Sequence, residues 1–560
     1  MKKLKQKIDV NQHNGARLLV QCLEQQGVSI IFGIPGAKID AVFDALVDSS
    51  IKLVICRHEQ NAVFMAAAYG RLTGRPGVVL VTSGPGVSNC VTGLLTATTE
   101  GDPVIAIGGN VSRAMQLKSS HQSTDNIKLV EAVTKARMNV VVAETIPEII
   151  DNAFRIAMMP RSGAVFISLP QDISLAHIEA QPLKCIGQPH YGVAPLDVIH
   201  QVAEQINQAK RPIFLLGLEA SRPRTTHSIR TLLRKCPFGV VCTFQGAGVI
   251  SRDLLACFAG RVGLFKNQPG DQLLDSADLI VTIGYSPVEY DPEIWNSQNL
   301  KHIIHIDNNL AEIHASYAPE LEVLGDISSN IDTLATLLKS NKTPDYLPWI
   351  QSLQTELMDV IERGASISGT KIHPLRFIYE LQKIADDNTI VISDIGSHYM
   401  WLARYYLCFQ PHHLLFSNGQ QTLGVAIPWA IAAGFIDPKQ TVISISGDGG
   451  FLFSAMELET AVREKIHFIH FVWCDGAYNM VQEQEIMKYQ RDSGVHFGPV
   501  DIVKFAESFG ATGFRVNHAN ELATVIAQAK MIKGPVLVEV PIDYSENHLL
   551  FSVSDDRTLN

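Results

Sequence analysis

The sequence predicts an α/β protein built from three doubly wound parallel-sheet domains. Short runs of β-branched residues repeatedly precede a turn that contains Gly or Asp, and an Ala-rich helical stretch follows the turn. This alternation is typical of parallel sheets, in which a helix connects each strand to the next. It occurs in three separate blocks, and a chain of 560 residues is too long for a single compact core.

The first block is predicted to form a domain over residues 10–180. Its strand candidates are residues 29–32, 53–56, 78–81, 104–107 and 164–168. A polar linker, roughly residues 174–195, separates this block from the next.

The second and third blocks repeat the alternation of strand and helix. The second is predicted to form a central domain over residues 194–340, with strand candidates at residues 212–216, 239–243, 279–283 and 302–306. The third is predicted to form a domain over residues 370–550, with strand candidates at residues 389–392, 441–446, 467–473 and 536–540.

The composition excludes several classes of protein. Hydrophobic residues make up 46% and charged residues 18%, which is ordinary for a globular protein and unlike a disordered or fibrous chain. A formal charge of -10 without a basic block argues against nucleic acid and anionic membranes as partners. No apolar run reaches the roughly 18 residues that span a bilayer, and the Lys-rich start does not lead into a hydrophobic signal core. The expected location is therefore the cytoplasm.

The nine cysteines contain no C-x-x-C pair and stand mostly in apolar surroundings. They are predicted to be reduced core residues: Cys22, Cys56, Cys90, Cys185, Cys236, Cys242, Cys257, Cys408 and Cys474.

Acidic residues follow two successive strand candidates of the third block. The sequence GDGG, residues 447–450, follows the strand at 441–446, and Asp475 follows the strand at 467–473. Ligands of open parallel sheets bind beyond the carboxyl ends of strands, and glycines let backbone N–H groups approach a diphosphate at a helix N-terminus. Asp448 and Asp475 would then hold Mg²⁺, which prefers carboxylates together with phosphate oxygens and water. The alternative is a tight turn in which Asp448 only caps a helix over residues 451–465.

A glutamate ends another strand candidate. Glu59 follows the strand at 53–56 and precedes the Ala-rich helical stretch at 64–69. A carboxyl group at this position could share a proton with a ring nitrogen of a bound cofactor. Alternatively, Glu59 only occupies the first turn of a helix, where the helix dipole favours negative charge.

Three further turns follow strands or precede helices. Residues 82–89, TSGPGVSN, fail the dinucleotide fingerprint because Asn89 stands where its third glycine would fall, which disfavours a Rossmann dehydrogenase. Residues 394–398, DIGSH, end a strand, and a plain polar turn is the alternative. Residues 417–424, SNGQQTLG, precede an apolar helical stretch in which Leu423 could be simple core packing.

Together these segments resemble those of thiamine diphosphate enzymes. Residues 57–62, RHEQNA, are similar to the family's R-H-E-x-x-A stretch, and Asp475 stands 27 residues after Asp448 (475 − 448), as in the family's Gly-Asp-Gly and Asn-Asn pattern. The resemblance covers nearly the whole chain and implies a pyrimidine-binding, a central and a diphosphate-binding domain in that order. Cys474 and Asp475 depart from the two asparagines of the pattern, and Asp475 keeps an oxygen ligand.

The resemblance also implies roles for individual residues. Glu59 would hydrogen-bond the aminopyrimidine and promote the imino tautomer that forms the ylid, whereas Asp448, Asp475 and the backbone carbonyl of Ala477 would bind Mg²⁺. Leu423 would force the two rings of the cofactor into a V. The other implied cofactor-binding residues are Pro35, Ser83, Gly84, Asn89, Gly396, Ser397, His398, Gly419, Gln420, Gly447, Gly449, Gly450, Tyr478, Asn479 and Met480.

Within the family, the chain is most similar to acetolactate synthases of the catabolic type that forms acetoin and butanediol. The segments that carry this similarity are residues 34–40, 121–123, 261–265, 283–290 and 478–481. The resemblance implies condensation of two pyruvates to 2-acetolactate and CO₂ through a thiamine-bound hydroxyethyl carbanion. FAD is not expected, because residues 284–290 stand in place of the R-F-D-D-R-V-T-G stretch of anabolic enzymes. Gln484 stands where the anabolic type has a Trp that favours 2-ketobutyrate as acceptor, so the resemblance implies pyruvate as the acceptor here.

Candidates for orienting the carboxylates of pyruvate or the developing alkoxide are Lys38, His121, Gln122, Gln421 and Gln484. Lys38 as a solvated surface charge and His121 as a loop histidine remain alternatives. Because the family's cofactor bridges the first domain of one subunit and the third domain of another, a homodimer is the minimum and a homotetramer is expected. Rival functions are a pyruvate oxidase, an oxalyl-CoA decarboxylase, an anabolic catalytic subunit, a thiamine sensor without turnover, and an NAD- or ATP-binding scaffold.

Overall fold

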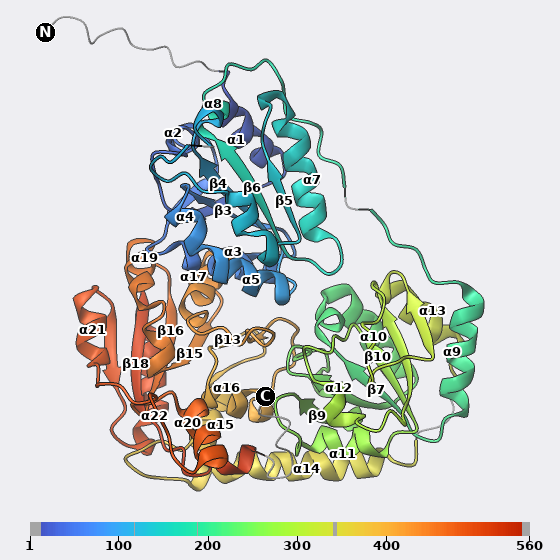
Figure 1. Ribbon diagram of the computed structural model, residues 1–560. Coiled ribbons are helices and arrows are strands. Elements are labelled where there is room, and N and C mark those ends of the chain that lie inside the picture. Colours follow the sequence, from blue (N-terminus) through green and yellow to red (C-terminus); the bar gives the residue numbers. More distant parts are fainter. Residues whose placement is uncertain (1–12, 117, 188, 340–343, 552–560) are drawn as a thin grey trace, which may run out of the picture. The chain divides into compact units, whose positions relative to one another are not determined.

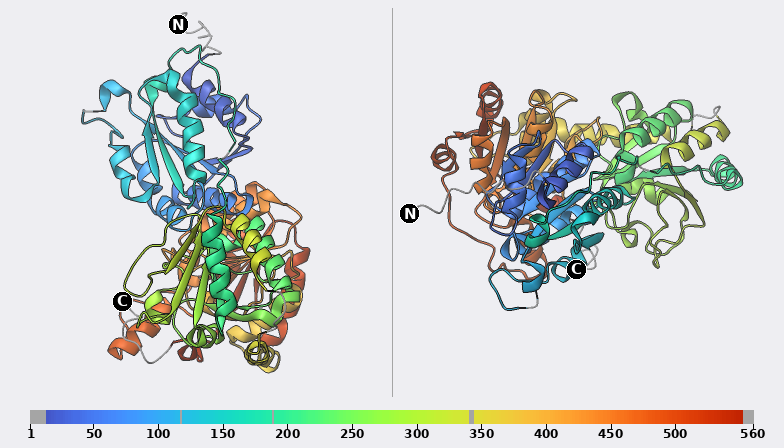
Figure 2. Two further views of the ribbon diagram at one scale, coloured as in Figure 1. Left: turned by 90° about the vertical axis from the view of Figure 1, so that its right-hand side faces the viewer. Right: turned by 90° about the horizontal axis from the view of Figure 1, so that it is seen from above.

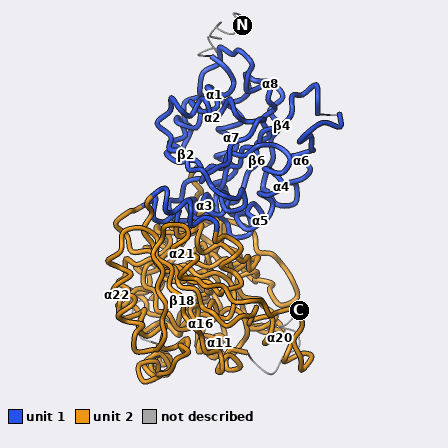
Figure 3. Tube along the Cα trace, turned by 90° about the vertical axis from the view of Figure 1, so that its left-hand side faces the viewer, with its two compact units in different colours: residues 1–189, 431–436, 456–464 blue, residues 190–430, 437–455, 465–560 orange. Residues whose placement is uncertain are grey.

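The computed structural model describes residues 13–116, 118–187, 189–339 and 344–551, which divide into two compact units (Figure 3). Unit 1 contains residues 1–189, 431–436 and 456–464, and unit 2 contains residues 190–430, 437–455 and 465–560. The predicted domain limits at residues 10 and 340 and the Lys-rich start lie outside the described residues.

Unit 1 contains a six-stranded parallel sheet with the strand order β2-β1-β3-β4-β6-β5. The four inner strands are fully buried, as expected for a sheet covered on both faces. The strands are β1 (Ile30–Gly33), β2 (Lys52–Ile55), β3 (Gly77–Val81), β4 (Val104–Asn110), β5 (Ala136–Asn139) and β6 (Ala164–Pro170).

Helices cover both faces of this sheet (Figure 1). Helix α3 packs on β3, β1 and β4, whereas α7 packs on β5, β6 and β4 and contacts α1; a second view shows α7 lying along the sheet (Figure 2, left). The helices of this region are α1 (Gly15–Gln25), α2 (Asp40–Leu46), α3 (Glu59–Thr73), α4 (Pro85–Asn89), α5 (Val91–Thr99), α6 (Asn126–Leu129), α7 (Ile146–Met158) and α8 (Gln171–Ser174).

The first sheet of unit 2 is also six-stranded and parallel, with the order β12-β11-β10-β7-β8-β9. Its strands are β7 (Pro212–Leu216), β8 (Gly239–Thr243), β9 (Phe258–Val262), β10 (Leu279–Ile283), β11 (His302–Asp307) and β12 (Leu321–Leu324). Its helices are α9 (Leu196–Gln208), α10 (Pro223–Lys235), α11 (Pro269–Ser276), α12 (Pro292–Trp295), α13 (Ile327–Leu337) and α14 (Leu347–Arg363).

The second sheet of unit 2 follows the same plan, with the order β14-β13-β15-β16-β18-β17. Its strands are β13 (Ile390–Ser393), β14 (Leu414–Leu415), β15 (Val442–Gly447), β16 (Phe468–Cys474), β17 (Thr512–Arg515) and β18 (Pro535–Pro541). The helices of this part of the chain are α15 (Pro374–Ile384), α16 (Ser397–Tyr405), α17 (Ala426–Ile436), α18 (Asp448–Phe451), α19 (Leu458–Arg463), α20 (Asn479–Tyr489), α21 (Ile502–Ser508) and α22 (Leu522–Met531). The two sheets of unit 2 are linked by Arg261 of β9, whose Nε donates to the carbonyl of Ala403 in α16 at 2.6 Å.

The predicted fold class is confirmed, because three parallel α/β sheets form within the described residues. All the predicted strands are present. Their first residues differ from the prediction by at most one position and their last residues by at most three. The strands β5, β9, β12, β14 and β17 were not predicted. The single helix predicted over residues 451–465 is wrong: the chain forms α18, the 3-10 helix η7 (Ala455–Glu457) and α19 instead.

The prediction that the cysteines are core residues is wrong for Cys185, which is exposed in the segment between α8 and α9. Six cysteines are buried, Cys408 and Cys474 are half-buried, and all nine are free. Among the described residues, none of the helices has the length and apolar character that a membrane span requires.

Candidate active site

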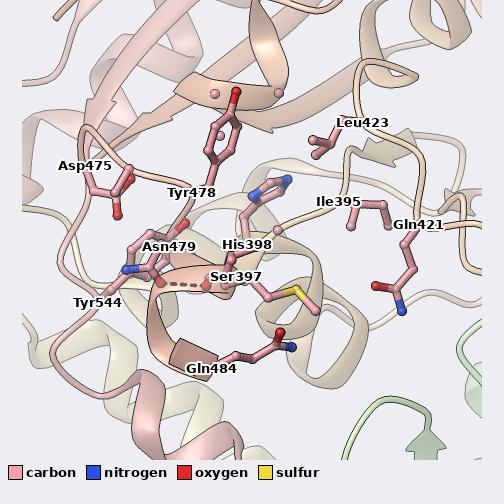
Figure 4. A pocket seen from close by; sticks show the side chains of 17 residues that line it. Ile395, Ser397, His398, Gln421, Leu423, Asp475, Tyr478, Asn479, Gln484 and Tyr544 are labelled. Atoms are coloured by element: carbon pink, nitrogen blue, oxygen red, sulfur yellow. Dashed lines mark hydrogen bonds between the residues drawn. The ribbon is translucent and has the colours of Figure 1, made fainter. Parts of the chain in front are cut away.

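A cavity of about 230 Å³ opens in unit 2 beyond the carboxyl ends of β13, β15 and β16 (Figure 4). The turn after each of these strands contributes to its wall. The lining residues are Ile395, Gly396, Ser397, His398, Gln421, Leu423, Gly447, Gly449, Gly450, Asp475, Ala477, Tyr478, Asn479, Met480, Val481, Gln484 and Tyr544.

Two helices of more than two turns begin at this wall. Ser397 is the first residue of α16 and Asn479 is the first residue of α20, and both line the cavity. The first N–H groups of a helix have no partner within the helix and carry partial positive charge. The wall therefore offers N–H donors and a positive potential to an anionic group such as a diphosphate.

The two helix starts are tied together by the side chain of Asn479. Its Oδ1 accepts hydrogen bonds from Ser397 Oγ at 2.7 Å (Figure 4) and from Asn547 Nδ2 at 2.6 Å. Asn547 is completely buried, and its Oδ1 accepts from Trp401 Nε1 at 2.7 Å. Because both lone pairs of Asn479 Oδ1 are used, its Nδ2 is left to serve the neighbouring carboxylate of Asp475.

Gly449 and Gly450, which follow β15, leave no room for a side chain at this part of the cavity wall. A Cβ atom on Gly449 would lie 2.6 Å from Cε1 of Tyr478, and one on Gly450 would lie 3.0 Å from Oδ2 of Asp394. Any larger residue at Gly449 would displace Tyr478, which is part of the wall.

Asp448 and Asp475 form a pair of acids at the ends of β15 and β16. The carboxylate of Asp448 accepts from the backbone N–H groups of Gly449 at 3.0 Å and Gly476 at 2.9 Å. Burial raises the pKa of Asp448, and burial together with the charge of Asp448 raises the pKa of Asp475 to about 7. The exposed surface of Asp475 faces the cavity that it lines.

This pair fits a divalent cation, because a cation would relieve the repulsion between two partly desolvated carboxylates. No group of three or more His, Cys, Asp or Glu side chains within the described residues could hold a metal ion. A metal at Asp448 and Asp475 would therefore draw its remaining ligands from the carbonyl of Ala477, from phosphate oxygens and from water, as Mg²⁺ does.

His398 lines the wall, and Asp394 fixes the chain just after Leu423, which also lines it. Burial lowers the pKa of His398 to about 3, so that its ring is neutral, and its Nε2 is without a hydrogen-bond partner among the described residues. Asp394 accepts from the N–H of Gly424 with both carboxylate oxygens at 2.9 Å, and burial raises its pKa to about 7. Gly424 has φ +87°, so this bond fixes a glycine-dependent turn directly after Leu423.

Glu59 is the first residue of α3 in unit 1. His58 caps this helix by accepting from the N–H of Gln60 at 3.1 Å, and Asn89 Nδ2 donates to Glu59 Oε2 at 2.9 Å. Glu59 as a whole is half-buried.

Other predicted residues of unit 1 lie in its loops. Ser83 is fully buried, and its Oγ has no hydrogen-bond partner in the described part of the chain. Gly84 adopts φ +61° and packs against Gln122, to whose Cα a Cβ at Gly84 would come within 3.2 Å. Lys38 is half-buried, whereas Pro35 and His121 are exposed.

The cavity gathers most, but not all, of the residues predicted for unit 2. Gly419, Gln420 and Asp448 are not part of its wall, although Asp448 accepts a hydrogen bond from Gly449, which lines it. Ile395, Val481 and Tyr544 line it without having been predicted. Tyr544 follows β18, so the rule that ligands bind beyond strand ends could have found it.

Comparison with known families agrees with this architecture. Residues 13–130 match the N-terminal TPP binding domain of thiamine pyrophosphate enzymes. Residues 199–337 match the central domain of the same enzymes, and residues 394–540 match their C-terminal TPP binding domain. The chain is therefore a thiamine diphosphate-dependent enzyme.

Similarity to individual proteins identifies the branch of this class. The chain is 48% identical to an acetolactate synthase of Bacillus subtilis (strain 168), over 98% of this chain and 96% of that protein. It is also 48% identical to a catabolic acetolactate synthase of Raoultella terrigena, over 96% of both chains. A probable acetolactate synthase large subunit of Methanocaldococcus jannaschii is 31% identical over 95% of this chain and 92% of that protein. The chain belongs to the acetolactate synthase family.

Proposed function

We propose that this enzyme condenses two molecules of pyruvate to 2-acetolactate and CO₂, and that the product feeds acetoin and butanediol formation. The observation that carries this proposal is the cavity of unit 2, where two helix starts and Asp475 line the wall and Asp448 follows the neighbouring strand β15. The similarity to a catabolic acetolactate synthase supports the pathway.

The diphosphate of the cofactor would bind at the starts of α16 and α20 and along the glycines after β15. Asp448, Asp475 and the carbonyl of Ala477 would hold Mg²⁺ against it, and Leu423 would support its rings. When bound, thiamine diphosphate supplies a nucleophilic carbon and stores the electron pair that decarboxylation releases.

Glu59 would hold and release the proton that activates the cofactor, with Asn89 orienting its carboxylate. Gln421 and Gln484 line the cavity and offer amide groups to a pyruvate carboxylate. Lys38, His121 and Gln122 are proposed as further pyruvate contacts from unit 1. In this proposal FAD is not required.

We further propose that the working enzyme is at least a homodimer and in full a homotetramer. Helix α20, which borders the cavity, has no buried residue in the described chain. Val481, Met487 and Tyr489 on this helix are all exposed. Such apolar side chains favour burial against another subunit.

Incubation of the purified protein with pyruvate, thiamine diphosphate and Mg²⁺, without FAD, tests the function. Acid treatment converts acetolactate to acetoin, and a colorimetric assay should detect acetoin in proportion to the pyruvate consumed. Absence of acetoin would reject the proposal. A yellow preparation that needs FAD would instead favour an anabolic enzyme or a pyruvate oxidase.

A further inference from the structure

A buried carboxylate of unit 1 lies next to the start of helix α3. Glu457 is the last residue of η7 and directly precedes α19. Its side chain is completely buried. Ionisable side chains are rarely buried in this way unless they are paired or hydrogen-bonded.

The carboxylate of Glu457 accepts four hydrogen bonds. Its Oε1 accepts from the backbone N–H groups of Arg57 at 2.9 Å and His58 at 3.0 Å, and from Asn61 Nδ2 at 3.1 Å. Its Oε2 accepts from Thr460 Oγ1 at 2.6 Å. All these partners belong to unit 1.

The two backbone donors immediately precede Glu59. His58 is the N-cap residue of α3, with extended backbone angles of φ −149° and ψ 140°, and Glu59 is the first helical residue. Because one carboxylate oxygen accepts from both N–H groups, Glu457 fixes the orientation of the two peptide groups that lead into Glu59. Asn89 fixes the other end of the same residue, its carboxylate.

We propose that Glu457 is a positioning residue for Glu59: it clamps residues 57 and 58 from a segment 400 residues away and so sets the direction of the Glu59 side chain. This inference rests on the proposed function only in assigning Glu59 as the proton-carrying group. The clamp itself is a property of the protein before any cofactor binds.

Two substitutions separate hydrogen-bond acceptance from other roles. Glu457→Gln keeps an oxygen that can accept from the three donors at Oε1. Its NH₂ group would face Thr460, whose hydroxyl can then donate instead to the carbonyl of Ile55, 3.5 Å away. Glu457→Leu fills a similar volume but offers no acceptor. The matched control is Glu459→Gln, because Glu459 is two residues away and 37% exposed, and it meets Arg57 only through the guanidinium at 3.9 Å.

The first measurement is amide hydrogen exchange in the protein without cofactor. The amides of Arg57 and His58 should exchange about tenfold faster or more in Glu457→Leu, and at nearly the wild-type rate in Glu457→Gln and Glu459→Gln. Unchanged protection in Glu457→Leu would overturn the clamp.

The second measurement is made on the loaded enzyme. In Glu457→Leu, kcat should fall by about 10- to 100-fold, with little change in KM for pyruvate. The bound cofactor should also exchange its acidic carbon-bound proton with D₂O about 10- to 100-fold more slowly. Glu457→Gln should restore both. Equal losses in the Gln and Leu variants would overturn the positioning role, because they would indicate that the charge or proton of Glu457 is what matters.

If Glu457→Leu does not fold, Thr460→Val replaces it, since this variant keeps the carboxylate and removes one of its four donors. It should raise exchange at Arg57 and His58 by about threefold, and unchanged exchange would overturn the proposal. Wild-type protein that forms no acetolactate would reject the proposed function, whereas the exchange experiment without cofactor would still decide whether the clamp exists.

Discussion

The environment of Asp475 determines the pH at which its carboxyl group loses its proton. Burial and the charge of Asp448 raise the pKa of Asp475 to about 7, well above the ordinary value of 3.8 for an aspartate. Between these values the folded protein without metal keeps a proton that the unfolded chain has lost, so its stability falls as pH rises through this range. The proton and a cation compete for the same carboxylate.

We therefore expect the apparent Mg²⁺ affinity, measured with thiamine diphosphate present, to rise up to about tenfold per pH unit below pH 7 and to level off above it. Titration calorimetry at several pH values measures this slope. Asp475→Asn keeps an oxygen ligand without a titrating proton and should show a shallower slope, which also controls for protonation of the cofactor's phosphates. Identical slopes in the two proteins would contradict the role of Asp475.

Glu59 is the second residue for which the geometry makes a direct prediction. Glu59→Gln preserves the shape of the side chain and the contact with Asn89 but cannot exchange a proton. Turnover should fall by about 100-fold or more, while the affinity for thiamine diphosphate, measured by quenching of intrinsic fluorescence, largely persists. Wild-type turnover in this variant would remove Glu59 from the mechanism.

For single residues, the sequence predicts what lies directly after a strand and little that depends on distant packing. Asp448, Asp475 and Ser397 were predicted because each stands in a turn that follows a recognisable strand. Glu457 carries no such local pattern, since the three donors to its Oε1 lie about 400 residues earlier in the chain. Tyr544 was missed although it follows β18, because an aromatic residue after a strand is usually core.

At the scale of elements, the five strands that were not predicted all lie at the edges of their sheets. Edge strands such as β5 and β17 are only partly buried, so they lack the continuous β-branched runs of the central strands. β14 is two residues long and gives no pattern at all. The central strands were predicted well because burial on both faces demands apolar residues.

The helix predicted over residues 451–465 fails for a related reason. The stretch contains good helix formers, but the chain leaves α18 after Phe451 and starts α19 at Leu458. The intervening η7 brings Glu457 to the N–H groups of Arg57 and His58. Tertiary hydrogen bonds thus override local helix propensity here.

The single turn of helix α18, which follows β15 directly, contains Gly449. Gly449→Ala would place a Cβ 2.6 Å from the ring of Tyr478, so the ring must move within the cavity wall. We expect about tenfold weaker binding of thiamine diphosphate. Gly498→Ala is the matched control because nothing lies within 4 Å of the added Cβ. Equal affinity in both variants would show that the turn tolerates a side chain.

At the scale of the whole molecule, the order of three α/β blocks was visible in the sequence because each block repeats the same alternation. The association of subunits through α20 can be tested by mutation. If a second copy covers the exposed apolar residues of α20, then Met487→Glu, at 41% exposure, should weaken association. Sedimentation analysis should show a shift toward smaller species, with Lys504→Glu, an exposed change on α21, as the control. A variant that sediments like the wild type would place the interface elsewhere.

Unit 1 is built from three separate chain segments, which limits how the protein can be truncated. Residues 431–436 and 456–464 pack with the first sheet: Phe435 contacts Phe32 with ring centroids 6.1 Å apart, and Glu464 pairs with Lys52 at 2.9 Å. A gene fragment that stops after residue 189 would omit these segments and leave their contact surfaces bare. Such a truncation should yield aggregated material, whereas supplying the missing stretches through an engineered fusion should recover a well-behaved product.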